Sequence, residues 1–149
     1  MPKYLSVSTT NKFKINKKVV HSIVSEINRE LNLKFSELEI NFVNNETILE
    51  LNKKYLKHNY NTDVITLTYP EGTFQLNGYI FISYEQAKEN SNRFITSLGN
   101  EILRLIIHGV LHIAGFKDKE IAEKKIMSNE EDRLVKKLDR YSKTILKNL

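Results

Sequence analysis

The chain has 149 residues, of which 40% are apolar and 28% are charged, and it carries a formal net charge of +5. This length suits one domain with a buried core, and the composition excludes a largely disordered chain. The absence of cysteine excludes disulfide frameworks, thiolate zinc fingers and a cysteine nucleophile. Histidine, aspartate and glutamate must therefore supply the ligands of any bound metal.

The sequence gives no sign of export or of a membrane segment. Residues 1–10 lack an uninterrupted apolar stretch, so no secretory signal is visible. The most apolar segment, residues 102–116, is broken by one arginine and two histidines and is too short to span a bilayer. No repeat or linker divides the chain. We therefore expect one domain over residues 1–149, a cytoplasmic protein and no membrane role.

The first part of the chain predicts a helix, a strand and a second helix. Residues 17–31 have apolar side chains at helical spacing, and Asn32 supplies a stop. Residues 38–42 alternate apolar and polar side chains, which is the pattern of a half-buried strand. Asn45 is then expected to cap a helix over residues 46–57.

Two further strands are predicted in the middle of the chain, over residues 63–69 and 79–83, where β-branched and apolar residues are frequent. Turn signals flank them, namely Pro-Glu-Gly at residues 70–72 and Asn-Gly at residues 77–78. The two strands are expected to pair. The sequence leaves open whether they do so as a direct hairpin.

The last part of the chain predicts three helices. Residues 84–91 indicate a short helix, and residues 97–114 a longer, buried one that ends at Gly115. After Asp118 a charged helix runs toward the C-terminus, with most of its charges on a solvated face. Its apolar face is expected to contain Met127, Leu134, Leu138, Tyr141 and Ile145. We expect a single-domain α+β fold in which a small mixed sheet of about four strands packs against helices.

One stripe of the long helix is polar although most of that helix is apolar. Glu101, Arg104, His108 and His112 lie three to four residues apart along it. Buried polar groups cost free energy unless they find partners, so this stripe needs an explanation. Two imidazoles at positions i and i+4 project from adjacent turns, at about the separation at which both can bind one metal ion.

Gly115 and Asp118 complete a metal-binding pattern with His108 and His112. A glycine with a positive φ angle lets the chain turn back after the helix, so that Asp118 can be the third ligand. This spacing is that of metzincin-like zinc sites, and three protein ligands leave a position open for water or substrate. The alternative is a chance pair of histidines without a metal. We predict a Zn²⁺ site, with nickel, cobalt and manganese left open because a carboxylate ligand makes the site harder.

The residue after the first histidine separates two kinds of chemistry. Zinc peptidases have a glutamate there, which acts as the general base, whereas this chain has Gly109. A metal ion can still act as a Lewis acid on a phosphodiester, and RNA carries a possible nucleophile in its 2′-hydroxyl group. The positive net charge also suits RNA better than a peptide.

Residues 108–116, His-Gly-Val-Leu-His-Ile-Ala-Gly-Phe, resemble the signature of the YbeY-type endoribonucleases of bacterial ribosomal RNA maturation. Three upstream segments support this resemblance in the same order and spacing. They are Leu-Asn-Lys-Lys-Tyr at residues 51–55, Thr-Asp-Val-Ile-Thr-Leu at 62–67 and Gly-Tyr-Ile-Phe-Ile-Ser at 78–83.

The resemblance implies an α+β domain with one zinc ion held by His108, His112 and Asp118. It also implies a single-strand-specific endoribonuclease that acts in 3′-end maturation of 16S ribosomal RNA and in ribosome quality control. The implied partners are small-subunit ribosomal RNA and small-subunit ribosomal proteins, with no role for DNA. Asp118 stands where the family usually has a third histidine, and carboxylates also bind zinc.

Two other positions depart from the family pattern. Leu56 replaces an arginine that the family is thought to use in RNA cleavage, and Tyr79 replaces an acidic residue. Lys57 or His58 would then have to contact phosphate in place of the arginine.

Arg104 is a third candidate phosphate contact, because it lies one turn before His108. The alternative for Arg104 is an ion pair with Glu101 on the same helix. Asp63, finally, is expected either to anchor the start of its strand or to orient a metal-bound histidine.

Three functions are compatible with these residues. The leading hypothesis is a metal-dependent endoribonuclease. The second is a metalloprotease-like zinc hydrolase, which Gly109 weakens. The third is a non-catalytic ribosome-assembly factor whose core is stabilised by a metal, a hypothesis favoured by Leu56 and Tyr79.

Overall fold

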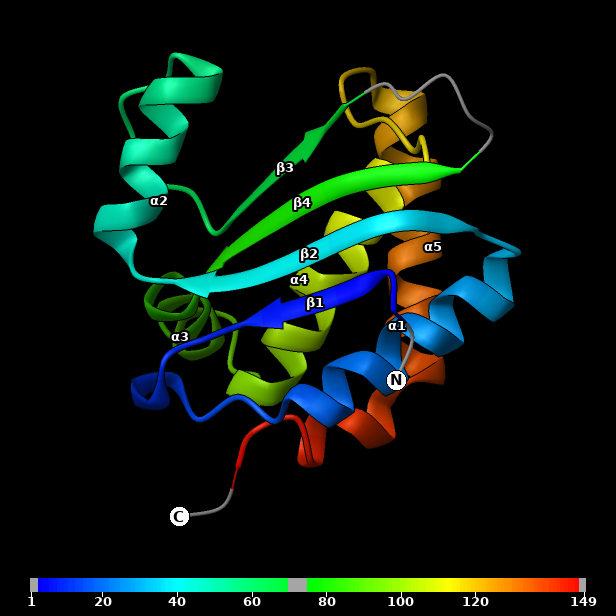
Figure 1. The fold of residues 1–149 in the computed structure, drawn as a ribbon, viewed down its shortest axis with the longest axis horizontal. Coiled ribbons are helices and arrows are strands. Elements are labelled where there is room, and N and C mark those ends of the chain that lie inside the picture. The colour runs from blue at the N-terminus through cyan, green and yellow to red at the C-terminus, as the bar shows by residue number, and fades with distance from the viewer. Residues whose placement is uncertain (1–2, 70–74, 148–149) are drawn as a thin grey trace.

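Four strands form one mixed sheet, and α1, α3, α4 and α5 lie on one of its faces (Figure 1). This computed structural model describes residues 3–69 and 75–147. The strands are β1 (Leu5–Ser8), β2 (Phe35–Val43), β3 (Val64–Thr68) and β4 (Leu76–Ser83). The α-helices are α1 (Lys17–Leu31), α2 (Asn45–Leu51), α3 (Tyr84–Arg93), α4 (Leu98–Ile113) and α5 (Ile121–Lys137). Short helical turns are η1 (Asn11–Phe13), η2 (Asn52–Leu56) and η3 (Asp139–Lys143).

The strand order is β1-β2-β4-β3. The pairs β1–β2 and β2–β4 are parallel, and β3–β4 is antiparallel. The expected α+β fold with a four-stranded mixed sheet is therefore confirmed. Since β3 and β4 are consecutive in the chain and adjacent in the sheet, they form the direct hairpin that the sequence left open. The turn predicted at residues 70–72 lies outside the described residues.

The Asn-Gly turn predicted at residues 77–78 is wrong, because both residues lie inside β4. A Cβ atom on Gly78 would lie 2.5 Å from the Ile113 Cδ1 atom and 3.2 Å from the Leu67 carbonyl oxygen. The glycine is therefore needed for the close packing of α4 on the sheet, which the local turn signal could not reveal.

The helix predicted after the second strand has a different cap and a different end. Asn44, and not Asn45, is the N-cap, since its Oδ1 atom accepts a hydrogen bond from the Thr47 amide at 2.8 Å. The α-helix ends at Leu51 and continues as the π-helical turn η2. The widened turn leads into the segment before β3.

The C-terminal helix is shorter than its apolar pattern suggests. It ends at Lys137, and Leu138 is its C-terminal cap. Tyr141 therefore lies in η3, and Ile145 lies beyond it, fully buried. These apolar residues still pack on the core, but from a folded-back segment and not from one continuous helix face.

The α4 helix is the centre of the core, as expected from its composition. Its apolar residues from Ile102 to Ile113 are buried between the sheet and the other helices. Within the described residues, no single helix is long and apolar enough to cross a membrane, and α3 and α4 meet that criterion only as a pair bent by 117°.

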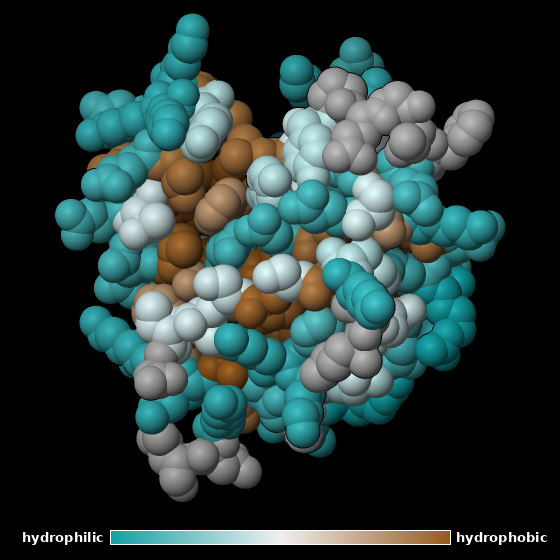
Figure 2. All heavy atoms as spheres, viewed as in Figure 1, coloured by the Kyte–Doolittle hydropathy of each residue, from teal (hydrophilic) through white to brown (hydrophobic). Residues whose placement is uncertain are grey.

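The opposite face of the sheet is partly open. Apolar side chains gather there between the α2–η2 segment and strands β3 and β4, in a groove of about 380 Å³ (Figure 2). Tyr79 lines this groove, next to Tyr69, with a ring-centroid distance of 5.4 Å. Because Ile80 points to α4, Tyr79 faces away from the helix that carries the histidines. This departure from the family pattern therefore does not border the metal motif.

Candidate metal centre

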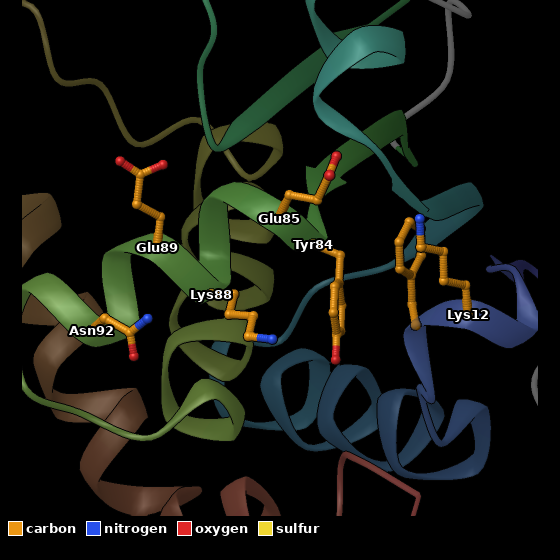
Figure 3. A pocket seen from close by; sticks show the side chains of 7 residues that line it. Lys12, Tyr84, Glu85, Lys88, Glu89 and Asn92 are labelled. Carbon is orange, nitrogen blue, oxygen red and sulfur yellow. The ribbon is translucent and has the colours of Figure 1, made fainter.

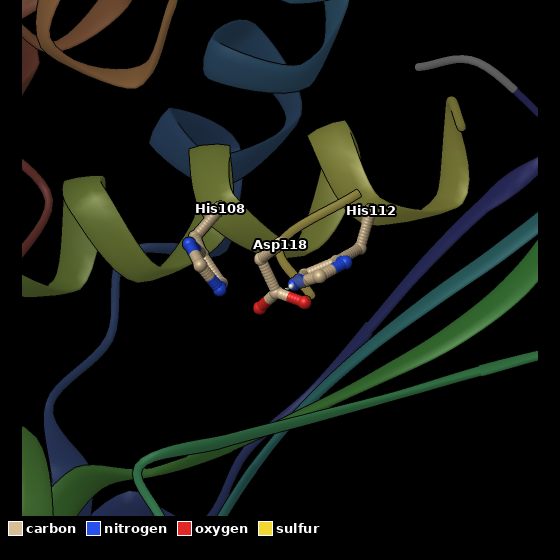
Figure 4. Close-up of side chains that lie close together, drawn as sticks. All are labelled: His108, His112 and Asp118. Carbon is tan, nitrogen blue, oxygen red and sulfur yellow. Dashed lines mark ion pairs between the residues drawn. The ribbon is translucent and has the colours of Figure 1, made fainter. Parts of the chain in front are cut away.

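His108 and His112 extend from the same side of α4, and Asp118 folds back toward them from the loop after the helix (Figure 4). One ligand atom from each side chain lies within 4.8 Å of the other two. The His112 Nε2 atom is 3.3 Å from the Asp118 Oδ2 atom. Gly115, with φ +107°, permits the reversal that brings Asp118 back.

The three side chains are half-buried, with exposed fractions of 29% for His108, 24% for His112 and 42% for Asp118. Two imidazoles and one carboxylate suit zinc and related first-row transition metals better than they suit Mg²⁺ or Ca²⁺, which prefer oxygen ligands only. This set of donors therefore fits a transition-metal ion such as zinc.

Gly109 lets α4 approach the sheet at the position of these ligands. A Cβ atom on Gly109 would lie 2.9 Å from two side-chain carbons of Ile80, which is fully buried on β4. The position where zinc peptidases have their glutamate is therefore packed against Ile80, and a longer side chain would fit there only if Ile80 moved.

The candidate ligands line a cavity of about 500 Å³ together with the segment that precedes β3. That segment contributes Leu56, His58, Tyr60 and Asp63, among others. The structure thus places His58 at the cavity, whereas Lys57 is exposed and is not part of its wall.

Asp63 has the first of its two expected roles, because it anchors the start of its strand. Its carbonyl oxygen accepts a hydrogen bond from the Ser83 amide at 2.9 Å, which anchors the start of β3 to β4. Its Oδ2 atom accepts a hydrogen bond from the Asn90 side-chain amide of α3 at 3.0 Å. The structure shows no direct bond from Asp63 to either histidine of the motif.

Arg104 binds two carboxylates of α5. Its Nη1 atom lies 2.8 Å from Glu131 Oε2 and 2.8 Å from Asp132 Oδ1. The alternative of an ion pair with Glu101 is therefore wrong, because helix α5 supplies nearer partners. Arg104 also does not line the cavity, so the structure does not bring this predicted phosphate contact to the candidate ligands.

Glu131 is the residue of this site that the sequence did not reveal. Its Oε1 atom lies 2.6 Å from His108 Nδ1, and its side chain is only 13% exposed. A carboxylate on one ring nitrogen fixes the tautomer and the orientation of a histidine whose other nitrogen binds a metal. Glu131 therefore links Arg104 to His108 and leaves the Nε2 atom of His108 for the cavity.

These contacts change the protonation of the two histidines in opposite directions. Burial lowers the pKa of His108, but the hydrogen bond and negative charge of Glu131 outweigh burial and raise this pKa above its usual value. Burial and the neighbouring His108 lower the pKa of His112. Burial tends to raise the pKa of Glu131, but its hydrogen bonds to His108 and Arg104 lower it overall, so Glu131 is ionised.

A second hollow, of about 560 Å³, lies between η1 and the start of α3 (Figure 3). Its wall consists of Lys12, Phe13, Tyr84, Glu85, Lys88, Glu89 and Asn92. It contains no histidine, and its charges are mixed. In residues 3–69 and 75–147, the only group of three side chains arranged to share a metal is the one on α4 and its following loop.

Comparison with known proteins assigns the family. A family model described as endoribonuclease YbeY matches residues 4–139. The chain belongs to this family. An endoribonuclease YbeY from Parabacteroides distasonis is 38% identical over 119 residues, which cover 80% of this chain and 83% of the relative. One from Bacteroides fragilis is 44% identical over 100 residues, covering 67% of this chain and 71% of the relative.

A solved structure has a similar fold. A protein from Thermotoga maritima, determined in solution, superimposes with a TM-score of 0.60 over 90% of this chain and 88% of the other. The sequence identity is 23%, so this likeness concerns the fold alone.

Proposed function

We propose that the protein is a metal-dependent endoribonuclease that cleaves single-stranded RNA. The observation that carries this proposal is the convergence of His108, His112 and Asp118 within 4.8 Å, at the wall of a cavity of about 500 Å³. Membership of the endoribonuclease YbeY family supports the same activity. Zinc is the proposed ion because two imidazoles and a carboxylate suit it.

A bound zinc ion would supply a Lewis acid for the oxygen atoms of a phosphodiester. The residues of the chain prepare the site for it. Glu131 holds His108 in one orientation, and the packing of Gly109 on Ile80 holds α4 against the sheet. Lys119 lines the same cavity and offers a positive charge to an RNA phosphate.

We further propose that the substrate is the precursor of small-subunit ribosomal RNA, cleaved near the 3′ end of 16S RNA, and that the protein takes part in ribosome quality control. This part of the proposal rests on the resemblance of the signature at residues 108–116. We also propose that the protein acts in the cytoplasm, with small-subunit ribosomal proteins as partners.

Packing at Gly109 argues against a peptidase. That position has no room for the glutamate that takes the proton from water in zinc peptidases. A non-catalytic assembly factor differs from the nuclease in one measurable respect, because it would retain the metal and have no cleavage activity.

The test uses the purified full-length protein. We expect about one zinc per chain by elemental analysis, and cleavage of an end-labelled single-stranded RNA that stops on chelation and returns with added zinc. A duplex of the same sequence should resist cleavage. His112→Ala should lose both metal and cleavage, whereas His21→Ala, a control on α1, should keep both.

Two outcomes contradict the proposal. If the wild-type protein holds zinc but does not cleave single-stranded RNA, the non-catalytic assembly factor becomes the favoured hypothesis. A His112→Ala variant that keeps its metal and its activity would place the reaction at another site.

A further inference from the structure

Two aromatic side chains form a stacked pair in the segment between η2 and β3. The rings of His58 and Tyr60 have centroids 5.0 Å apart and planes inclined by 16°. The Tyr60 hydroxyl lies 3.0 Å from the His58 Nδ1 atom, within hydrogen-bond distance. The two rings therefore support each other, and each ring covers only one face of the other.

The buried Asn52 fixes the backbone of this pair. Its carbonyl oxygen accepts a hydrogen bond from the His58 amide at 3.2 Å, and its Nδ2 atom donates one to the Tyr60 carbonyl at 2.7 Å. Asn52 is only 1% exposed. Lys57, with φ +56°, turns the chain just before these two anchored residues. The segment is thus held by the core although its side chains face solvent.

The pair borders the candidate metal centre. His58 and Tyr60 line the same cavity as His108, His112 and Asp118. Tyr60 is 57% exposed, so much of its surface remains available to a ligand. Exposed aromatic rings held in a fixed orientation are a feature with which proteins bind unpaired nucleobases by stacking. Lys119 supplies positive charge at the same cavity.

We infer that Tyr60, supported by His58, is a base-stacking subsite for the nucleotide next to the scissile phosphate. This inference rests on the proposed endoribonuclease activity and specifies how that site selects its substrate. In a duplex both faces of every base are covered by neighbouring bases, so only an unpaired nucleotide can stack on Tyr60. The subsite thereby makes cleavage selective for single strands, and its stacking tolerates every base.

The experiment compares three variants of the metal-loaded, full-length protein. Tyr60→Ala removes the ring, and Tyr60→Phe keeps the ring without the hydroxyl. Tyr55→Ala is the matched control, because Tyr55 is similarly exposed, at 51%, but lines the groove on the other face of the sheet. Zinc content and thermal unfolding of each variant show whether the metal centre and the fold are intact.

Two measurements test stacking. The first is the affinity for a fluorescent, fully 2′-O-methylated single strand, measured by anisotropy. We expect Tyr60→Ala to weaken binding by about 10-fold, in line with the loss of one stacked base, and to raise KM more than it lowers kcat. Tyr60→Phe and Tyr55→Ala should remain within about 2-fold of wild type.

The second measurement is a double-mutant cycle, in which one change is made in the protein and the other in the RNA substrate. Abasic nucleotides are placed one at a time around the cleaved bond, and kcat/KM is measured for wild type and for Tyr60→Ala. At one position next to the bond, the missing base should lower kcat/KM by about 10-fold in wild type and have little effect in Tyr60→Ala, because the partner ring is already absent.

The outcomes separate the inference from the function on which it rests. If wild type neither binds nor cleaves single-stranded RNA, the proposed function fails, and the subsite fails with it. If wild type cleaves RNA but Tyr60→Ala binds within 2-fold of wild type, or retains the full abasic effect, only the stacking subsite is overturned.

Discussion

The two walls of the cavity at the candidate metal centre are built differently. On the α4 wall, the candidate ligand His108 is held by Glu131, and Glu131 is held in turn by Arg104. On the opposite wall, residues 56–60 are exposed, and a single buried side chain, Asn52, bonds their backbone at two points. On the first wall, ion pairs hold the side chains. On the second wall, the buried contacts hold the backbone, and the exposed rings of His58 and Tyr60 support each other.

This difference indicates that the two walls have separate functions. Metal binding needs donor atoms placed to within a fraction of an ångström, and the candidate ligands His108 and His112 accordingly project from a helix packed in the core. The exposed side chains of the loop wall can change at little cost to the core, because Asn52 bonds only the backbone there. Leu56, where the family usually has arginine, lies on this second wall. Changes on the α4 wall should therefore alter metal binding and stability, and changes on the loop wall should alter RNA binding.

The largest effect should follow the loss of a ligand on the α4 wall. In His112→Ala the metal keeps at most two of its three side-chain ligands, so we expect at least a 100-fold loss of zinc affinity. Competition with a chromogenic chelator measures this affinity. Tyr60→Ala, on the other wall, should bind zinc as wild type does. Equal zinc affinity in His112→Ala and wild type would contradict the assignment of the ligands.

The next-largest loss of zinc affinity should follow a substitution of Glu131. In Glu131→Gln the charged acceptor of His108 is replaced by a neutral amide of similar shape, so zinc affinity should fall by about 10- to 100-fold. Asp132→Asn is the matched control, because Asp132 also accepts from Arg104 at 2.8 Å but makes no bond to His108. The spectrum of the cobalt-substituted protein should change in Glu131→Gln alone. A similar loss in both variants would mean that Arg104 and not Glu131 controls the site.

Gly109→Ala tests the packing that brings α4 to the sheet. Glycine to alanine inside a helix ordinarily stabilises by about 0.5–1 kcal/mol. Here the new Cβ atom would meet Ile80 at 2.9 Å, so we expect the free energy of unfolding to fall by about 1–3 kcal/mol in urea titrations. Asn129→Ala, on the exposed side of α5, should change it by less than about 0.5 kcal/mol. A more stable Gly109→Ala protein would contradict this expectation.

The sequence was sufficient for the parts of the site that are local. The three candidate ligands lie within residues 108–118, where helical spacing and one glycine place them together. Glu131 lies 23 residues from His108, and the packing of α5 on α4 brings the two together. In the sequence it stands between Glu130 and Asp132 and looks like part of a solvated charged face, so no local pattern marks it as a partner of His108.

The fold shows the same limit. The helices with long apolar patterns were predicted, whereas β1 has four residues and pairs with β2 more than 30 residues away. A short alternating segment such as Leu5–Ser8 gains its stability from that distant pairing and gives little local signal. At Gly78, similarly, the local sequence indicates a turn, but the residue lies in β4, where Ile113 packs against it.

The smallest expected effect concerns Glu101, a buried acidic residue in the first turn of α4. Glu101 is only 5% exposed. Burial and the nearby Asp63 raise the pKa of its carboxyl group above the usual value, although Arg104 and Asn90 oppose the shift. A raised pKa in the folded state means that the stabilising contribution is complete below the unfolded pKa and is lost as the pH rises through the folded pKa.

Glu101→Gln removes this titration and keeps the shape of the side chain. The variant should therefore gain stability relative to wild type as the pH rises from 4 to 8, because only the wild type has to ionise a buried carboxyl group. Urea unfolding at both pH values measures the difference. Glu50→Gln, an exposed control on α2, should show no such trend. A difference for Glu101→Gln that is equal at pH 4 and pH 8 would show that the α4 wall tolerates the ionised carboxylate, and that burial there is less complete electrostatically than the packing indicates.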